Sequence, residues 1–315
     1  MKIGEALLKQ FKTIFDMLDV LKTNKDCIKF LEELIWEDIP VSPFDYTSKV
    51  YKCKNGRYKC KNTNKYFNIL TGTIFENTKI SLRYWFVAIY EEQVSRKGIA
   101  STELAKRLNI TQSTAWYMLQ KIRKCMEKEN FQKLKGTVEV DEFHAGGSLK
   151  NMHYNKKLEA REKGIFQNKT LLQGFVKRGG DAVIRLIPDK TDSTLIAGIL
   201  RHVEHGSTLY SDDNPSYQKV PSLYNQANVV HSKGNYVSKD DKNVHTNTIE
   251  SVWATLSRTI DTYIHVSKKH MQNYANETTF RYNTRKMEPI DALIWLLQNI
   301  TNTRMTRKEI LLGIY

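Results

Sequence analysis

The sequence predicts an α/β fold in which a mixed β-sheet flanked by helices follows a basic hairpin and a helical region. Three observations predict it. A strand-like run begins at Thr137 and is followed by two glycines, a second strand-like run ends at Asp212, and an amphipathic helix begins near Asn247. The 315 residues suffice for a buried core and for two or three domains. We expect five segments, over residues 1–40, 41–80, 81–130, 135–290 and 291–315.

The composition of the chain indicates its class of partner and the compartment in which it works. The net charge of +15 and the pI of about 9.4 favour a polyanionic partner, with nucleic acid first. No apolar run approaches the roughly 18 residues of a membrane span, and the N-terminus lacks the long apolar core of a secretory signal. Four scattered cysteines favour a reducing compartment over a disulfide framework. We therefore expect a protein of the cytoplasm, associated with the nucleoid, or of the nucleus in a eukaryote.

The apolar spacing before residue 40 predicts one or two amphipathic helices, because apolar residues recur three and four positions apart. They are Leu7, Leu8, Phe11, Ile14, Phe15, Leu18 and Leu21. Their expected role is packing. A helical tail is expected over residues 291–315.

A β-hairpin is predicted where Asn55 and Gly56 join two alternating segments. With a two-residue loop, Cys53 pairs with Tyr58. Cys60 then lies diagonal to Cys53 on the same face of the hairpin.

The same hairpin is basic, and its cations alternate with tyrosines, which favours contact with phosphate groups. The cations are Lys49, Lys52, Lys54, Arg57, Lys59 and Lys61, and Arg57 and Lys59 are our DNA-binding candidates. A structural zinc site usually needs two Cys-x-x-Cys pairs. The segment holds one incomplete pair, Cys60-Lys61-Asn62-Thr63, and no pair upstream, so we expect no zinc.

Residues 81–130 predict a helix-turn-helix DNA-binding region. Helices are expected over 81–90, 101–108 and 112–124, and the last two are joined by three residues, which is the length of a helix-turn-helix connection. Thr111 is the expected cap of the third helix. On this reading the third helix enters the major groove; the alternative is a plain helical subdomain. The DNA-binding candidates on the third helix are Gln112, Ser113, Thr114, Tyr117, Lys121 and Arg123.

From residue 135 the pattern changes to strands. Strands are expected at 137–141, 170–177 and 182–187, then a helix from about 192 to 203, a strand ending at Asp212, a short strand at 228–231 and a helix from about Asn247. Three strands, a helix, two strands and a helix is the order of a ribonuclease-H-like sheet.

Acidic side chains mark the ends of these elements. The first strand should end at Asp141, as the later strand ends at Asp212. Glu250 lies on the flank of the apolar stripe of the helix that begins near Asn247. Two such aspartates and a helical acid can hold two divalent ions, and hard oxygen ligands suit Mg²⁺ or Mn²⁺. The alternative is that Glu139 and Asp141 lie on a solvated face. Asn247 could reach the same place as Glu250, or it could cap the helix.

Several motifs together resemble the bacterial insertion-sequence DDE transposases related to the eukaryotic Merlin elements, the group with ISXO-like transposase domains. They are Val138-Glu139-Val140-Asp141-Glu142 with Gly146-Gly147, Tyr210-Ser211-Asp212 with Tyr217, His231-Ser232, and the run from His245 to Trp253. Upstream and downstream the resemblance includes residues 71–77, 85–90, 114–119, 274–277 and 280–285, so it covers nearly the whole chain after residue 45.

The resemblance implies a ribonuclease-H-like DDE catalytic domain over residues 135–290 with two metal ions. It implies cutting and joining at the terminal inverted repeats of an element, with double-stranded DNA of the element ends and the target as partner. We expect a homodimer or higher oligomer on that DNA. Carried over by position, the catalytic set is Asp141, Asp212 and either Glu250 or Asn247, of which we expect Asp141, Asp212 and Glu250 to bind metal.

Two departures from the family stand out. Its zinc ribbon has four cysteines, of which this chain keeps only Cys60, and so residues 41–80 are a degenerate zinc-ribbon-like hairpin. The lysine that the family places seven residues after the glutamate is Ser257 here, with Arg258 next to it as a DNA-binding candidate. Two alternatives to an active transposase remain: a catalytically inactive relative that still binds element ends, and a metal-dependent nuclease that cuts without joining.

Overall fold

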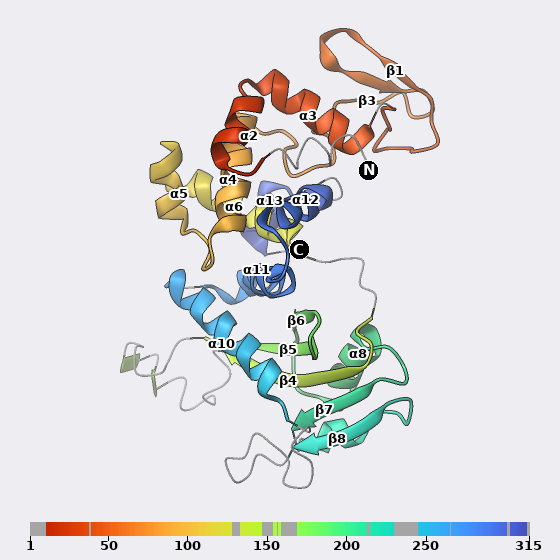
Figure 1. The fold of residues 1–315 in the computed structure, drawn as a ribbon, viewed down its shortest axis with the longest axis vertical. Helices are drawn as coiled ribbons and strands as arrows, with labels where there is room; N and C mark the ends of the chain where they lie inside the picture. Colours follow the sequence, from red (N-terminus) through yellow and green to blue (C-terminus); the bar gives the residue numbers. More distant parts are fainter. Residues whose placement is uncertain are drawn as a thin grey trace. The chain divides into compact units, whose positions relative to one another are not determined.

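The computed structural model of the chain describes residues 11–37, 39–127, 133–146, 154–155, 157–158, 169–212, 215–229, 245–264, 266–300 and 303–313. The chain forms two compact units: Met1–Met126 with Lys286–Tyr315, and Glu127–Arg285 (Figure 1). Predicted features at Leu7, Leu8, Gly147, His231 and Ser232 lie outside the described residues. None of the helices in the described ranges has the length and apolar character to cross a membrane.

The first unit is built mainly from helices that surround an aromatic core. They are α2 (Ile14–Val20), α3 (Asn24–Trp36), α4 (Leu82–Val94), α5 (Ser101–Leu108), α6 (Gln112–Cys125), α12 (Pro289–Asn299) and α13 (Arg307–Leu312). Thr13 and Thr23 begin α2 and α3 with capping boxes, in which each accepts a bond from the backbone N–H three residues on. Phe30 packs edge-on against Phe86 at 5.5 Å, and Trp85 against Phe75 at the same distance. The described C-terminal helices thus belong to the same unit as the N-terminal ones.

The hairpin of the first unit has a different register from the one predicted. β1 (Val50–Lys52) pairs antiparallel with β2 (Tyr58–Cys60), and β3 (Tyr66–Phe67) adds a third strand. Tyr58 lies opposite Lys52, so its predicted pairing with Cys53 is wrong. Cys60 lies opposite Val50, and alternation therefore puts Cys53 on the other face.

The turn explains the difference. Lys54–Gly56 form a 3-10 turn, Gly56 has φ +67, and the N–H of Cys53 donates to the carbonyl of Arg57 at 2.8 Å. A three-residue loop that ends on a left-handed glycine replaces the expected two-residue turn, which shifts every later pair by one position.

The helices α4, α5 and α6 occupy the predicted ranges to within a few residues. Asn109 adopts a left-handed conformation (φ 50) that ends α5. The hydroxyl of Thr111 accepts a bond from the N–H of Thr114 and caps α6. The three-residue connection is therefore as expected.

The second unit holds a five-stranded mixed sheet in the order β6-β5-β4-β7-β8 (Figure 1). The strands are β4 (Thr137–Ala145), β5 (Thr170–Lys177), β6 (Ala182–Leu186), β7 (Thr208–Asp212) and β8 (Asn225–Val229). β4, β5 and β6 pair antiparallel, whereas β7 is parallel to β4 and to β8. β8 begins three residues before the predicted strand at 228–231.

Helices cover both faces of this sheet. α8 (Asp192–His202) and α9 (Pro215–Gln218) pack on one face over Val138, Val140 and Phe175. α10 (Asn247–Thr262) crosses β4 and β5 on the other face, beside α11 (Met271–Thr284), which follows the short 3-10 helix η4 (Lys268–His270) (Figure 1). The predicted α/β class, a mixed sheet flanked by helices, is confirmed.

Candidate active site and nucleic-acid interface

Asp141 lies in the middle of a strand, and the prediction that β4 ends there is wrong. β4 runs four residues further, to Ala145, because β5 pairs with it along its length and sets Gly174 opposite Asp141. β7 pairs with β4 only as far as Glu139 opposite Tyr210. Asp141 therefore lies just past the end of the β4–β7 ladder.

The sheet register brings Asp141 and Asp212 together. Extending the parallel register two residues beyond the last β4–β7 pair brings Asp212, the last residue of β7, level with Asp141. Alternation along both strands puts the two side chains on the α10 face. The negative charge of Asp212 helps to raise the pKa of Asp141, because a neighbouring carboxylate disfavours a second negative charge.

Burial dominates the electrostatics of Asp141. Its pKa is raised to about 7, chiefly because burial disfavours the charged form, with further contributions from the charges of Glu142 and Asp212. Trp253 of α10 donates its indole N–H to Oδ2 of Asp141 at 2.9 Å, which fixes the carboxylate. This bond and a backbone hydrogen bond from Glu142 oppose the rise in the pKa of Asp141. The Trp253 ring stacks on Phe143, with centroids 5.1 Å apart.

Glu139 is fully buried, so it does not lie on a solvated face. It accepts bonds from Arg178 Nε at 2.8 Å, Thr248 Oγ1 at 2.8 Å and the N–H of Ile249 at 2.9 Å. Two of these donors belong to the first turn of α10, where backbone N–H groups lack partners within the helix. Glu139 therefore ties the start of α10 to β4. Sequence reasoning missed this role, although the alternation that pairs Glu139 with Asp141 on one face was a signal for it.

Glu142 is the second acid that sequence reasoning missed. It points to the opposite face, where the Tyr217 hydroxyl donates to Oε1 and Lys190 Nζ lies 3.0 Å from Oε2. Burial and the charge of Glu142 raise the pKa of Tyr217 well above its ordinary value, so Tyr217 remains a donor. These contacts hold β4 from the face opposite Asp141.

The helix α10 has the predicted apolar stripe, since Ile249, Val252, Trp253 and Leu256 are buried against the sheet. Glu250 and Asn247 are exposed in its first turn. The cap of α10 is Thr246, so the alternative of Asn247 as the cap residue is wrong; Glu139 satisfies the N–H of Ile249.

Among the described residues, no three His, Cys, Asp or Glu side chains gather closely enough to hold a metal ion. Glu250 therefore does not join the aspartate pair in this conformation. The donors that are present still fit a hard divalent cation. Asp141 is a buried carboxylate beside a second one, with a raised pKa that a cation would lower, and its Oδ1 is not used by Trp253.

Two of the predicted DNA contacts are wrong. Lys121 and Arg123 are each 1% exposed, because α6 is enclosed by α4, α5, α12 and α13 over its last turns. Lys121 Nζ donates to the carbonyl of Ile74 at 2.6 Å, and Arg123 lies 3.2 Å from Glu92 in a buried ion pair. These two cations stabilise the helical core.

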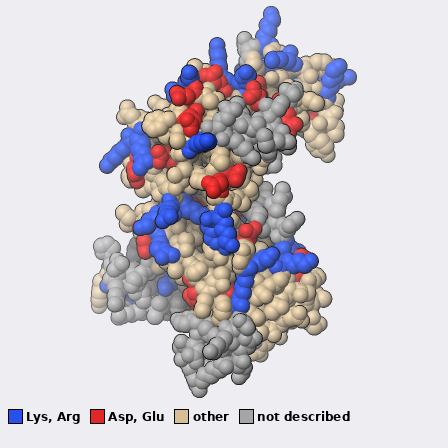
Figure 2. All heavy atoms as spheres, viewed as in Figure 1, with Lys and Arg blue, Asp and Glu red and all other residues tan. Residues whose placement is uncertain are grey.

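The remaining DNA-binding candidates are accessible. Gln112 and Ser113 are exposed at the start of α6, Thr114 and Tyr117 are half-buried next to them, and Arg258 is exposed on α10. Arg57 is exposed, and Lys59 lies 5.7 Å from the Tyr66 ring. Lys and Arg side chains stand out from the β1–β2 hairpin in Figure 2.

The environment of Cys60 is polar. Burial acts to raise the pKa of the Cys60 thiol, but the polar surroundings at Ser42, Ser48 and Thr63 outweigh burial and lower that pKa to about 6. Cys53, on the other face, donates weakly to the carbonyl of Tyr51.

Comparison with known proteins gives two matches. Residues 133–283 match the family described as the ISXO2-like transposase domain. A protein of Halobacterium salinarum, described as an uncharacterized protein in transposable element ISH50, is 26% identical over 251 residues, which cover 77% of this chain and 83% of the relative. The resemblance that the sequence motifs indicated is thereby confirmed.

Proposed function

Because residues 133–283 match the ISXO2-like transposase domain, we propose that the chain is a DNA transposase with a ribonuclease-H-like catalytic domain. It binds the terminal inverted repeats of its element and catalyses metal-dependent cleavage and transfer of DNA strands. The observation that supports the proposal is the nearness of two carboxylates: Asp141 and Asp212 each lie two residues past the last pair of the parallel β4–β7 ladder, and the charge of Asp212 contributes to the raised pKa of Asp141. That pairing of carboxylates is what a metal-dependent nuclease centre requires.

Asp141 and Asp212 would hold the metal ions, which are Mg²⁺ or Mn²⁺. When bound, such ions supply Lewis-acid activation of a water molecule and offset the charge that develops on the phosphodiester. The chain's part is to orient the carboxylates. Trp253 fixes Oδ2 of Asp141 by its indole N–H, and the Glu139 bonds fix the first turn of α10, which carries Glu250.

Glu250 is our candidate for the third metal ligand, and Asn247 for an outer partner. Two divalent ions beside two aspartates leave an excess of positive charge, which a full carboxylate offsets better than a neutral amide. The exposed side chain of Glu250 is free of the apolar stripe, so a rotamer change in the first turn of α10 can turn it toward the aspartates.

DNA binding is assigned to the basic hairpin and to the start of α6. Arg57 and Lys59 of the hairpin would contact phosphates, and Gln112, Ser113 and Thr114 would contact bases, while Arg258 on α10 would contact DNA at the catalytic domain. Ser81–Cys125 contain the helix-turn-helix of this assignment.

A strand-transfer assay with labelled element ends tests the proposal. The wild-type chain should cut and join these ends in Mg²⁺, and Asp141→Asn or Asp212→Ala should abolish cleavage while end binding stays nearly intact. Asp261→Asn, an exposed acid on α10, is the control and should cleave normally. Near-normal cleavage by Asp212→Ala would show that the assignment is wrong.

The same assay separates the two alternatives. End binding without cleavage by the wild-type chain would identify an inactive relative, and cleavage without joining would identify a nuclease. The observation that favours testing for an inactive relative is the exposure of Glu250, the proposed third metal ligand.

A further inference from the structure

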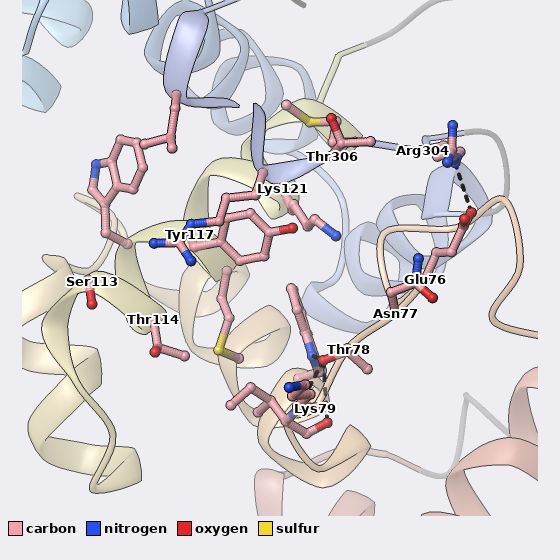
Figure 3. Close-up of a pocket in the computed structure, with 17 residues that line it drawn as sticks. Glu76, Asn77, Thr78, Lys79, Ser113, Thr114, Tyr117, Lys121, Arg304 and Thr306 are labelled. Atoms are coloured by element: carbon pink, nitrogen blue, oxygen red, sulfur yellow. Dashed lines mark hydrogen bonds and ion pairs between the residues drawn. The ribbon is translucent and has the colours of Figure 1, made fainter. Parts of the chain in front are cut away.

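A cavity of about 560 Å³ opens beside the first two turns of α6, within the first unit. Four parts of the chain line it: α6 residues between Ser113 and Lys121, residues 76–80, Trp85 of α4, and C-terminal residues between Arg304 and Leu311. Figure 3 shows Ser113 and Thr114 on one side, and the Arg304–Glu76 ion pair on the other. The volume lies within the range of small-ligand sites, about 300–1,000 Å³.

The lining combines aromatic rings with positive charge. Trp85, Trp116 and Tyr117 supply the rings, and the lining residues include four cations against one carboxylate; these charged residues are Lys79, Lys121, Arg304, Arg307 and Glu76. A planar ring that carries a phosphate matches both properties. Base stacking on aromatic side chains next to cationic groups is how proteins hold unpaired nucleotides.

Tyr117 is the residue that best fits a stacking platform. Its ring projects from α6 into the cavity (Figure 3). The ammonium of Lys121 lies 4.9 Å from the ring centroid and is itself held by the carbonyl of Ile74 at 2.6 Å. The Tyr117 ring is thus supported from the core, which reduces the entropy that a ligand must overcome.

Exposed cations line the same cavity as this ring. Arg307 is exposed at the start of α13. Burial raises the pKa of Tyr117, and the charges of Arg307 and Glu309 act on that pKa in opposite directions. Arg304 is oriented by Glu76, with Nε 2.9 Å from Oε2. Lys79 is exposed on the facing segment. A phosphate at the rim can therefore meet Arg307 and Lys79 while the attached ring enters the cavity.

We propose that this cavity binds an unpaired deoxynucleotide of single-stranded DNA, with its base against Tyr117 and its phosphate at Arg307 and Lys79. A base within a duplex is stacked on its neighbours and cannot enter, so the site selects unpaired ends or extruded bases. The choice of DNA rests on the proposed function, whereas the binding of an unpaired nucleotide rests on the cavity itself.

The test is the binding of fluorescently labelled (dT)5 to the full chain, followed by anisotropy. Tyr117→Leu should weaken binding roughly fivefold to a hundredfold, the loss expected of one stacked base. Tyr117→Phe, which keeps the ring, should bind within about twofold of wild type. Arg307→Ala should weaken binding and lower the log–log salt slope by about 0.7, the value for one phosphate of a single strand.

Matched controls come from the same unit. Tyr84 is an exposed tyrosine and Lys308 an exposed lysine, and neither lines the cavity. Tyr84→Leu and Lys308→Ala should leave (dT)5 binding unchanged, and equal losses in Tyr84→Leu and Tyr117→Leu would overturn the proposal. So would an abasic pentamer that binds as tightly as (dT)5.

The result of this binding test can be distinguished from the result of the strand-transfer test of the proposed function. Asp141→Asn should bind (dT)5 like the wild type, because the cavity lies wholly in the first unit. If the wild-type chain does not cleave DNA but binds (dT)5 through Tyr117, the inference holds and the proposed function fails. If the wild-type chain is an active transposase but Tyr117→Leu binds (dT)5 as tightly as wild type, the inference is wrong and the proposed function holds. Near-ultraviolet circular dichroism of each variant verifies that the aromatic core is retained.

Discussion

Glu139 and Asp141 have different roles although they lie two residues apart on the same face of β4. Glu139 is surrounded by donors from Arg178 and from the first turn of α10, so its charge is compensated within the protein. Asp141 accepts bonds from the Trp253 indole N–H and the backbone of Glu142, no cation pairs with it among the ion pairs of the described residues, and the charge of Asp212 acts on it. The first carboxylate is suited to holding the structure, and the second to holding a cation.

We therefore expect Glu139→Gln to act on stability. The change leaves Arg178 facing an amide and weakens the bonds to α10, which should lower the free energy of unfolding by about 2–3 kcal/mol. Urea unfolding of the purified variant measures it. Glu204→Gln is the control: Glu204 is partly exposed and lies 3.2 Å from Lys135, and the change should alter that free energy by less than about 0.5 kcal/mol. Equal effects of the two changes would contradict the role given to Glu139.

The identity of the third ligand is a second question at the residue scale. Glu250→Gln removes a charge near the metals, so we expect it to reduce strand cleavage by about tenfold or more, whereas Asn247→Ala should cost less. Raising the Mn²⁺ concentration should partly restore Glu250→Gln. Cleavage rates in Mg²⁺ and Mn²⁺ measure both effects, and normal cleavage by Glu250→Gln with an inactive Asn247→Ala would reverse the roles.

Among the elements, β5 and α10 fit together at one glycine. A Cβ added to Gly174 would lie 2.5 Å from the Trp253 ring and 2.9 Å from Ile249, both of which pack on the sheet. The missing side chain lets α10 approach β5 closely, and this approach positions the Trp253 indole at Asp141.

Gly174→Ala should therefore destabilise the sheet unit by about 1–3 kcal/mol, the usual cost of overpacking, and should also lower cleavage. Gly180→Ala is the matched control. Its Cβ would meet only the flexible side chain of Lys177, at 2.7 Å, so the cost should be small. Thermal unfolding compares the two, and a Gly174→Ala variant with wild-type stability would show that α10 can shift without loss.

The elements also show how far sequence could predict this structure. Period-2 and period-3.6 patterns located the main strands and helices, because those periods follow from which face is buried. They could not give the β4 end, since antiparallel pairing with β5 extends the strand beyond Asp141. They failed at Lys121 and Arg123, because the helices that enclose α6 include α12 and α13, which are distant in sequence. Charge at a helix end predicts a solvated face only when no distant segment covers it.

At the scale of the whole molecule, the sheet unit contains a histidine that makes its stability depend on pH. Burial and the charges of Arg185, Arg201 and Lys133 lower the pKa of His202 to about 4. The unfolded chain takes up this proton near pH 6.5, but the folded chain does so only near pH 4. The free energy of unfolding should therefore fall as the pH drops from 6.5 to 4, by an amount of the order of 1–3 kcal/mol.

Comparison with His202→Gln isolates this effect, because Asp141, with a raised pKa, acts in the opposite direction over part of the range. Urea unfolding at several pH values should give a steeper loss for wild type than for His202→Gln below pH 6.5. Parallel curves for the two proteins would rule out a contribution from His202.

The first unit is built from two stretches of the chain, one before and one after the second unit in the sequence. This order has a consequence for synthesis on the ribosome. α12 and α13 pack on α4 and α6, yet Glu127–Arg285 must be translated before them. At about 5–20 residues per second, that delay is of the order of 10–30 s. During this delay the sheet unit can fold, whereas the apolar faces of α4 and α6 that pack on α12 and α13 are not yet covered. A nascent chain that stops before α12 would carry the two aspartates and the start of α6, but its first unit would lack the two helices that cover α4 and α6. The sheet unit with the acidic pair can therefore be complete before the helical unit is.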